Sequence, residues 1–376
     1  MKIFAVVNGD VLEDLGMNTT PTLTRIHFLL SELKKSCKVE VLSIGFRLSS
    51  KRGLRSTIYN NLLKSIAALQ SALLMGFYRP KVYFAYPHSL TTPQNRVLFR
   101  FCRMLDLDII LDIHDTMEQG KAVGAGRFLL KEPQEEYFIN NSTYVLVLNE
   151  FMWSHLKERY NIAQDIKAVI VPNAYEDSFC KLYPHAYMGV EGRFNICYLG
   201  GLTKNRGIDI LVEACQGLHQ KFPYLRLYIF GSYQDGSDLQ LRNAIERSDF
   251  IQRRIVPRKE LLSSLNEVDL FVMPYNPMEP YMNFSSPTKL YEYIGTGKPI
   301  LCTKCESILE LGKDGGIVYV DNDPVDLEKK AEMLILNPEI MEKLSRELIR
   351  MRPQHTWGER AKTVYLALQP PSGTIL

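Results

Sequence analysis

The chain has 376 residues, of which 46% are hydrophobic, and its formal net charge is only +3. This length and apolar content are enough for two domains, each with its own core. No apolar run of about 18 residues and no signal peptide is visible, and the seven cysteines are scattered, so we expect a cytoplasmic protein rather than a membrane-spanning or secreted one. Nucleic acid is not an expected partner, because no recognition motif accompanies the basic residues.

The first half of the chain alternates short apolar strands with amphipathic helices. This alternation is typical of parallel α/β sheets that are buried on both faces. A helix is predicted over residues 22–35 after a loop from Asn8 to Pro21. The predicted strands of this half are residues 2–7, 39–46, 109–115, 145–148 and 169–173.

Charge is unevenly distributed along the chain. Residues 1–131 carry 18 Lys and Arg against 10 Asp and Glu. A basic cluster precedes residues 58–78, where apolar side chains recur at helical spacing; it consists of Arg47, Lys51, Arg52 and Arg55. Such a profile fits contact with anionic lipid headgroups. It also fits a helix that packs on the sheet while its cations face solvent, and the sequence does not decide between the two.

A polar stretch over residues 176–193 marks the expected boundary between a domain at 1–178 and a second domain at 190–352. A last helix is predicted at about residues 356–370. The second domain begins with a strand, a glycine turn with two cations (Gly200 to Gly207) and a helix with apolar residues at 208, 211, 212 and 215. Two further strands are predicted at 227–232 and 268–274.

The segment from Ser286 to Ile300 is the most informative part of the sequence. Ser286 and Pro287 are predicted as the N-cap and first residue of a helix that ends at Gly297, before a buried strand. A helix N-terminus attracts anions, and Lys289 adds a full charge there. Glu292, one turn deeper, is placed to accept hydrogen bonds from a sugar diol. Phosphate and ribose together indicate a nucleotide, although an ordinary capped helix would show the same residues.

Taken in order, these motifs resemble the donor-binding domain of GT-B glycosyltransferases, specifically the retaining family 4 group. The resemblance extends to the first half through the strand that ends in His114 and Asp115, through Pro172 and Asn173, and through the helix that Trp357 opens. It implies that this last helix, about residues 356–370, packs back on the first domain. It implies an α/β protein of GT-B architecture, in which two Rossmann-like domains face each other across a cleft.

The resemblance also implies roles for individual residues. Those expected to bind the donor nucleotide sugar are Gly201, Lys204, Arg206, Ser286, Thr288, Lys289 and Glu292. His114, Arg206 and Lys289 are expected to be catalytic, although a histidine that closes an apolar strand can also be structural. Gly16, Asn18 and Asp115 are expected on the acceptor side. The chain departs from the family pattern where Gly201 replaces an arginine and Phe284 replaces a glutamate.

The function implied is that of a retaining glycosyltransferase that needs neither a metal nor a cofactor. Its donor would be a UDP-, GDP- or dTDP-sugar, and its acceptor a lipid-linked or polysaccharide glycan at the inner face of a membrane. Two alternatives stay open. One is a GT-B sugar-nucleotide epimerase, which needs acidic residues in the cleft, and the other is a non-catalytic nucleotide-sugar-binding subunit that supports a partner transferase.

Overall fold

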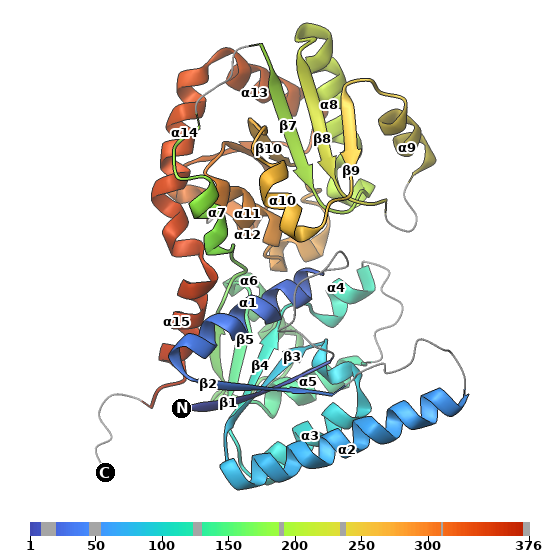
Figure 1. The fold of residues 1–376 in the computed structure, drawn as a ribbon, viewed down its shortest axis with the longest axis vertical. Coiled ribbons are helices and arrows are strands. Elements are labelled where there is room, and N and C mark those ends of the chain that lie inside the picture. Colours follow the sequence, from blue (N-terminus) through green and yellow to red (C-terminus); the bar gives the residue numbers. More distant parts are fainter. Residues whose placement is uncertain are drawn as a thin grey trace. The chain divides into compact units, whose positions relative to one another are not determined.

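A computed structural model describes residues 1–8, 20–44, 54–122, 130–187, 192–233, 238–309 and 311–370. These residues form two compact units (Figure 1). Unit 1 runs to Pro172 and takes in the last helix from Trp357 onward, and unit 2 comprises residues from Asn173 to Thr356.

Unit 1 is built on a six-stranded sheet in which every pairing is parallel. Its strands, in spatial order, are β2 (Lys38–Ser43), β1 (Lys2–Val7), β3 (Lys81–Tyr86), β4 (Ile109–Ile113), β5 (Tyr144–Val147) and β6 (Lys167–Ile170). The strand order reverses between β1 and β3. At such a switch point the loops that follow the two strands diverge, and open α/β sheets bind their ligands there.

Unit 1 contains seven α-helices among the described residues, and the first begins at a typical N-cap residue. α1 (Pro21–Ser36) begins at Thr20, whose side chain accepts a hydrogen bond from the Leu23 N–H at 3.3 Å. The others are α2 (Leu54–Tyr78), α3 (Pro93–Met104), α4 (Met117–Ala122), α5 (Glu132–Asn140), α6 (Glu150–Arg159) and α15 (Trp357–Ala367). The buried Trp357 ring stacks on Phe28 of α1, with centroids 6.3 Å apart, so the C-terminal helix packs on the first unit.

Unit 2 has a second all-parallel sheet of six strands. Its order is β12 (Ile317–Val320), β11 (Ile300–Thr303), β10 (Leu270–Met273), β7 (Phe194–Leu199), β8 (Leu225–Phe230) and β9 (Ile251–Arg254). This is the strand order of the dinucleotide-binding Rossmann fold, and its switch point lies between β7 and β10. The turn after β7 therefore borders the expected ligand crevice of this unit.

The helices of unit 2 cover its sheet on both sides (Figure 1). They are α7 (Asp177–Leu182), α8 (Ile208–Lys221), α9 (Leu239–Glu246), α10 (Arg258–Ser264), α11 (Thr288–Thr296), α12 (Glu306–Leu309), α13 (Pro324–Leu336) and α14 (Pro338–Met351). The α8 residues expected to be apolar and inward, Ile208, Leu211, Val212 and Cys215, are all buried.

The sequence predicted the α/β class and most strands correctly to within a few residues, and the fold class is confirmed. One helix start is wrong. Helix α11 begins at Thr288 and its cap position is Pro287, not Ser286. Its predicted end is right, because Gly297 has φ +69° and accepts the left-handed conformation that closes the helix.

All seven cysteines of the chain are free thiols, and five of them are buried. Within the described part of the chain, no helix combines the length and the apolar character needed to cross a bilayer.

Candidate functional site

The turn after β7 is the centre of the candidate site in unit 2. Gly200 has φ +121°, a conformation that residues with a Cβ rarely adopt. Gly207, a few residues on, has φ +63°, and a Cβ there would lie 1.7 Å from the carbonyl oxygen of Pro274, which follows β10. The two glycines therefore allow the loops after β7 and β10 to approach each other closely at the switch point.

Two cations meet over Gly200. A Cβ built on Gly200 would lie 2.5 Å from Lys289 Nζ and 3.5 Å from a terminal nitrogen of Arg206. Lys289 comes from the start of α11, and Arg206 from the short 3-10 turn Lys204–Arg206. Burial, and then the charge of Arg206, lower the pKa of Lys289 well below its ordinary value. An anion between these two groups would relieve their mutual repulsion.

Two tyrosines hold Lys289 in position. Lys289 Nζ donates a hydrogen bond to the Tyr198 hydroxyl at 3.0 Å, and it lies 4.3 Å from the centre of the Tyr198 ring and 4.8 Å from that of Tyr275. The Tyr198 hydroxyl in turn donates to the carbonyl oxygen of Gly201 at 3.1 Å. The sequence analysis did not select either tyrosine. Their positions at the ends of two neighbouring strands, β7 and β10, were the available signal.

The hydroxyl groups of Thr288, the first residue of α11, and of Ser286, two residues before it, have different contacts. The Thr288 hydroxyl is buried and has no hydrogen-bond partner among the described residues. A buried hydroxyl left unpaired at a helix N-terminus beside two cations is suited to an incoming anion. The Ser286 hydroxyl is already occupied, because it accepts the Asn173 N–H at 2.9 Å and contacts the Tyr291 hydroxyl at 3.2 Å. Ser286 therefore anchors the segment before α11, and its contact with a donor stays a prediction.

Glu292 lies in a buried ion pair. Its carboxylate accepts from Arg258 of α10 at 2.7 Å, and Arg258 also donates to Glu176. Arg258 was not predicted from the sequence, because nothing in a sequence indicates which distant carboxylate an arginine will contact. A contact of Glu292 with a ribose stays a prediction.

The candidate residues of unit 1 follow β4. His114 is buried, and its backbone N–H donates a hydrogen bond to the Tyr86 carbonyl oxygen at 3.3 Å. The Nδ1 atom of its imidazole has no hydrogen-bond partner among the described residues. Burial lowers the pKa of His114 to about 3, against an opposing effect of Asp112, so the imidazole is neutral at pH 7. Burial also raises the pKa of Asp115 to about 7.

A buried charge cluster lies beside His114. Arg25 of α1 donates to both carboxylate oxygens of Asp112, at 2.7–3.1 Å, and the Tyr83 hydroxyl donates to the same carboxylate at 2.6 Å. Arg25 and Asp112 are 1% and 0% exposed. This cluster ties α1 to β3 and β4, so it fixes the strand end from which His114 emerges.

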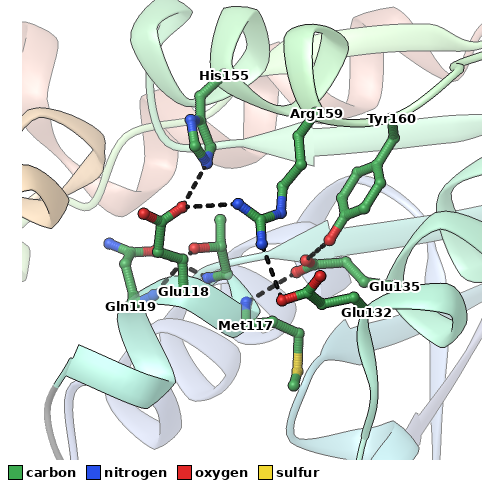
Figure 2. A network of polar contacts seen from close by, with 9 residues as sticks. Met117, Glu118, Gln119, Glu132, Glu135, His155, Arg159 and Tyr160 are labelled. Atoms are coloured by element: carbon green, nitrogen blue, oxygen red, sulfur yellow. Dashed lines mark hydrogen bonds and ion pairs between the residues drawn. The ribbon is translucent and has the colours of Figure 1, made fainter.

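A second polar network fixes the segment after Asp115 (Figure 2). The Glu135 carboxylate accepts from the Met117 N–H at 3.0 Å and from the Tyr160 hydroxyl at 2.5 Å. Arg159 of α6 reaches Glu118 on α4 and Glu132 on α5, at 3.3 and 2.9 Å. Three helices are thereby joined around the start of α4, two residues beyond Asp115.

Some predicted residues lie outside the described part of the chain. They are Gly16 and Asn18 of the first loop, Arg47, Lys51 and Arg52 of the basic cluster, and the side chains of Arg55 and Lys204. Among the described residues, no group of three or more His, Cys, Asp or Glu side chains could hold a metal ion. A hollow of about 810 Å³ in unit 1, lined by Lys2, Lys81 and Lys167, lies at the amino ends of the strands, opposite the edge that carries His114.

Two units, each built on an all-parallel six-stranded sheet with a switch point in its strand order, are the architecture of the GT-B fold. Residues 193–337, which lie in unit 2, match the family described as Glycosyl transferases group 1. The fold inferred from the sequence is confirmed, and this match agrees with the resemblance inferred for residues 193–337.

The comparison with curated proteins gives a partial match. The TuaH protein of Bacillus subtilis, whose name assigns it to teichuronic acid biosynthesis glycosyltransferases, is 25% identical over 149 residues. The match covers 39% of this chain and 36% of that protein, so the chain spans about a third of the length of this relative.

Solved structures show the same fold over almost the whole chain. Sucrose-phosphate synthase from Thermosynechococcus elongatus matches with a TM-score of 0.64 at 13% identity, covering 97% of each chain. HepE of Anabaena, in complex with UDP and glucose, matches with a TM-score of 0.62 at 13% identity over 98% of each chain. UDP-GlcNAc 2-epimerase from Neisseria meningitidis, bound to UDP-GlcNAc, has a TM-score of 0.57 at 12% identity, with 98% of this chain and 99% of that chain covered.

Proposed function

We propose that the protein is a retaining glycosyltransferase that transfers a sugar from a nucleotide-diphosphate sugar to a lipid-linked or glycan acceptor without a metal ion. The observation that carries the proposal is the pair of cations, Lys289 and Arg206, at the Gly200 turn beside the start of α11. The unpartnered Thr288 hydroxyl at the same helix start supports it. The match of residues 193–337 to a glycosyltransferase family supports the reaction class.

The chemical task of such a site is to stabilise the departing diphosphate. As the bond from the sugar C1 to the phosphate oxygen breaks, a bond from C1 to the acceptor oxygen forms on the same face, and the acceptor proton passes to the leaving phosphate. Negative charge then grows on the diphosphate. Lys289, Arg206 and the first N–H groups of α11 are fixed before the reaction starts, so they stabilise this charge without rearranging.

In unit 1, His114 would bind the transferred sugar as a neutral imidazole. Its imidazole is neutral near pH 7, since its pKa is lowered to about 3. A neutral ring with an unpartnered Nδ1 can exchange a hydrogen bond with a sugar hydroxyl and so orient the transferred sugar. Asp115, next in the chain, would contact the acceptor, as would Gly16 and Asn18 of the first loop.

Two other functions remain as outcomes of the test. A non-catalytic nucleotide-sugar-binding subunit is consistent with Gly201 in the place of the family arginine. An epimerase is consistent with the fold shared with UDP-GlcNAc 2-epimerase. Each leaves a different product pattern, so one assay separates all three.

The test incubates the purified full-length chain with radiolabelled UDP-, GDP- and dTDP-sugars, with and without glycan acceptors. Without an acceptor we expect slow hydrolysis of one donor to free sugar and nucleoside diphosphate. With an acceptor, the sugar should pass to the acceptor hydroxyl at a higher rate, and the rate should be undiminished in EDTA. Arg206→Ala should lose roughly 10²- to 10³-fold in rate, as for the removal of one preorganised charge-stabilising group. The matched control is Arg346→Ala, an exposed arginine of the same unit that pairs with Glu342.

Two results would contradict the proposal. Conversion of the donor sugar to its epimer, with the nucleotide retained, would identify an epimerase. Binding of a donor without any cleavage, across all three nucleotides and with acceptors present, would identify a binding subunit. Loss of activity in EDTA with recovery in Mn²⁺ would overturn the metal-free part alone.

A further inference from the structure

Helix α2 presents a continuous apolar face to solvent. Its exposed apolar side chains are spaced four, four, three, four and four residues apart, which keeps them on one side of a helix. They are Ile58, Leu62, Ile66, Leu69, Leu73 and Phe77, between 44% and 79% exposed. At 1.5 Å rise per residue this face is about 29 Å long, and it covers roughly 300 Å² in projection, a size at which exposed patches are often functional.

The opposite side of α2 is the one that packs on unit 1. Ser71 and Met75 are 5% and 0% exposed, and Met75 contacts Cys102 of α3 with the two sulfur atoms 3.5 Å apart. A helix that only covered a sheet would turn its leucines inward. Here a side that includes a serine packs inward and the leucines face outward. Of the two interpretations left open by the sequence, packing of the apolar stripe on the sheet is therefore wrong for these residues.

The chemistry of the surroundings indicates what covers this face. Residues 41–105, which include α2 and its neighbour α3, contain ten Lys and Arg and no Asp or Glu. Arg100 and Arg103 of α3 are exposed. An apolar stripe within a purely cationic stretch of chain matches a membrane interface, where acyl chains lie beneath anionic headgroups.

We infer that α2 lies in the interface of an anionic membrane, with the apolar face from Ile58 to Phe77 inserted among the lipid chains. The exposed arginines of α3, Arg100 and Arg103, then contact phosphate headgroups. Since no described helix meets the requirements for spanning, the attachment is peripheral. A second copy of the chain is a poorer occupant, because pairing two α2 faces would bring like charges together without an acidic partner from this stretch.

The inference deepens the proposed function, since a lipid-linked acceptor is met at such a surface, but it rests on unit 1 alone. Its test therefore uses no sugar nucleotide, and either claim can fail without the other. The full-length chain is floated with vesicles of phosphatidylcholine alone and with vesicles containing 30% phosphatidylglycerol. We expect binding to the anionic vesicles only, and weaker binding as salt rises, because a Debye length of about 10 Å at 0.1 M screens exposed charges.

The decisive variant is Leu62→Ser/Leu69→Ser/Leu73→Ser. These side chains are 57–67% exposed, so folding should be preserved while vesicle binding falls at least tenfold. The matched control is Leu239→Ser/Leu336→Ser/Leu366→Ser, three leucines on other helices that are 61–68% exposed. This control should bind vesicles like the parent chain. Thermal unfolding checks that both variants remain folded.

A site-specific measurement locates the inserted face. In Leu73→Trp the added indole should shift its emission to the blue on addition of anionic vesicles and be quenched by brominated lipids, whereas Leu336→Trp should show neither effect. Equal vesicle binding by the parent and the α2 variant would overturn the inference. So would a concentration-dependent dimer in the parent that the α2 variant abolishes, since that result would assign the face to a second copy.

Discussion

Lys289 and Arg206 converge on one point, the Cβ position that Gly200 lacks, at 2.5 and 3.5 Å. Lys289 Nζ is held there by the hydroxyl of Tyr198, so the repulsion between the two cations is not relieved by a movement of Lys289. Its pKa is lowered by burial first and by Arg206 second. This relationship predicts a proton linkage in ligand binding.

Binding of a nucleoside diphosphate should raise the pKa of Lys289 back toward its ordinary value, because the anion stabilises the charged form. Above the lowered pKa, the ligand must therefore bind together with a proton, and its affinity should fall as pH rises. Calorimetric titration in two buffers of different ionisation enthalpy measures the protons taken up. Lys289→Met should abolish the uptake, whereas the exposed Lys304→Met should leave it unchanged. Proton uptake that persists in Lys289→Met would assign it to another group.

The buried pair of Arg25 and Asp112 predicts a large stability effect. Arg25→Met leaves an uncompensated carboxylate in the interior, which typically costs about 3–5 kcal/mol in the free energy of unfolding. Arg25 lowers the pKa of Asp112 against the raising effect of burial, so the wild-type pair loses stability as pH falls through that pKa. Without Arg25, the Asp112 carboxyl group should protonate more readily. The difference in the free energy of unfolding between the wild type and Arg25→Met should therefore be smaller at acid pH.

Urea unfolding monitored on unit 1, at pH 7 and at pH 4.5, measures both effects. Arg25→Met/Asp112→Leu, which removes both charges, should recover much of the loss. The exposed pair of Arg346 and Glu342 is the control, and Arg346→Met should change stability by less than about 1 kcal/mol. A deficit at pH 7 as small as that of the control would show that Asp112 is not charged in the folded chain.

The strands could be predicted because each is a short apolar run that burial on both faces requires. The end of α11 could be predicted as well, because only Gly297 suits the conformation that closes it. The start was misplaced because Ser286, an apt N-cap by residue type, uses its hydroxyl for the distant Asn173 instead. The preference of serine for the N-cap position was overridden there by a contact between residues far apart in the chain.

Long-range contacts also explain what the sequence could not indicate at the site. The sequence does not distinguish Arg258 from the other arginines, because its contacts with Glu176 and Glu292 form only in the folded chain. The sequence did not determine, for a different reason, whether the apolar face of α2 is buried or exposed. Helical spacing shows that apolar residues share a face, but it does not show whether that face meets the sheet or the outside.

Glu292 and Glu176 share Arg258, and this gives a matched pair of variants. Glu292→Gln and Glu176→Gln should each weaken the ion pair and lower the melting temperature, because both carboxylates contact the same guanidinium. If Glu292 also accepts the ribose hydroxyls, only Glu292→Gln should weaken nucleotide binding, by about 1.5–3 kcal/mol for a hydrogen bond to a charged group. Calorimetric titration with the free nucleotide, together with thermal unfolding, makes the comparison. Equal affinities in the two variants would remove the ribose role from Glu292.

Asp115 should make stability depend on pH in the direction opposite to most carboxylates. Its pKa is raised from 3.8 to about 7 in the folded chain, so between these pH values the folded state binds more protons than the unfolded state. The contribution of the protonated group is complete below about pH 4 and is lost as pH rises to about 7. Asp115→Asn removes the group that must ionise. It should therefore raise the melting temperature at pH 8 and leave it nearly unchanged at pH 4.

The same substitution also tests the acceptor-side role. A group with a pKa of about 7 that contacts the acceptor should give the rate an inflection near pH 7, and Asp115→Asn should remove that inflection. His114→Asn should lower the rate yet leave the shape of the profile between pH 5 and 8, because the pKa of His114 is about 3 and the ring does not titrate there. Asp165→Asn, at an exposed position of the same unit, is the control for both measurements. An inflection near pH 7 that survives in Asp115→Asn and disappears in His114→Asn would reverse the two assignments.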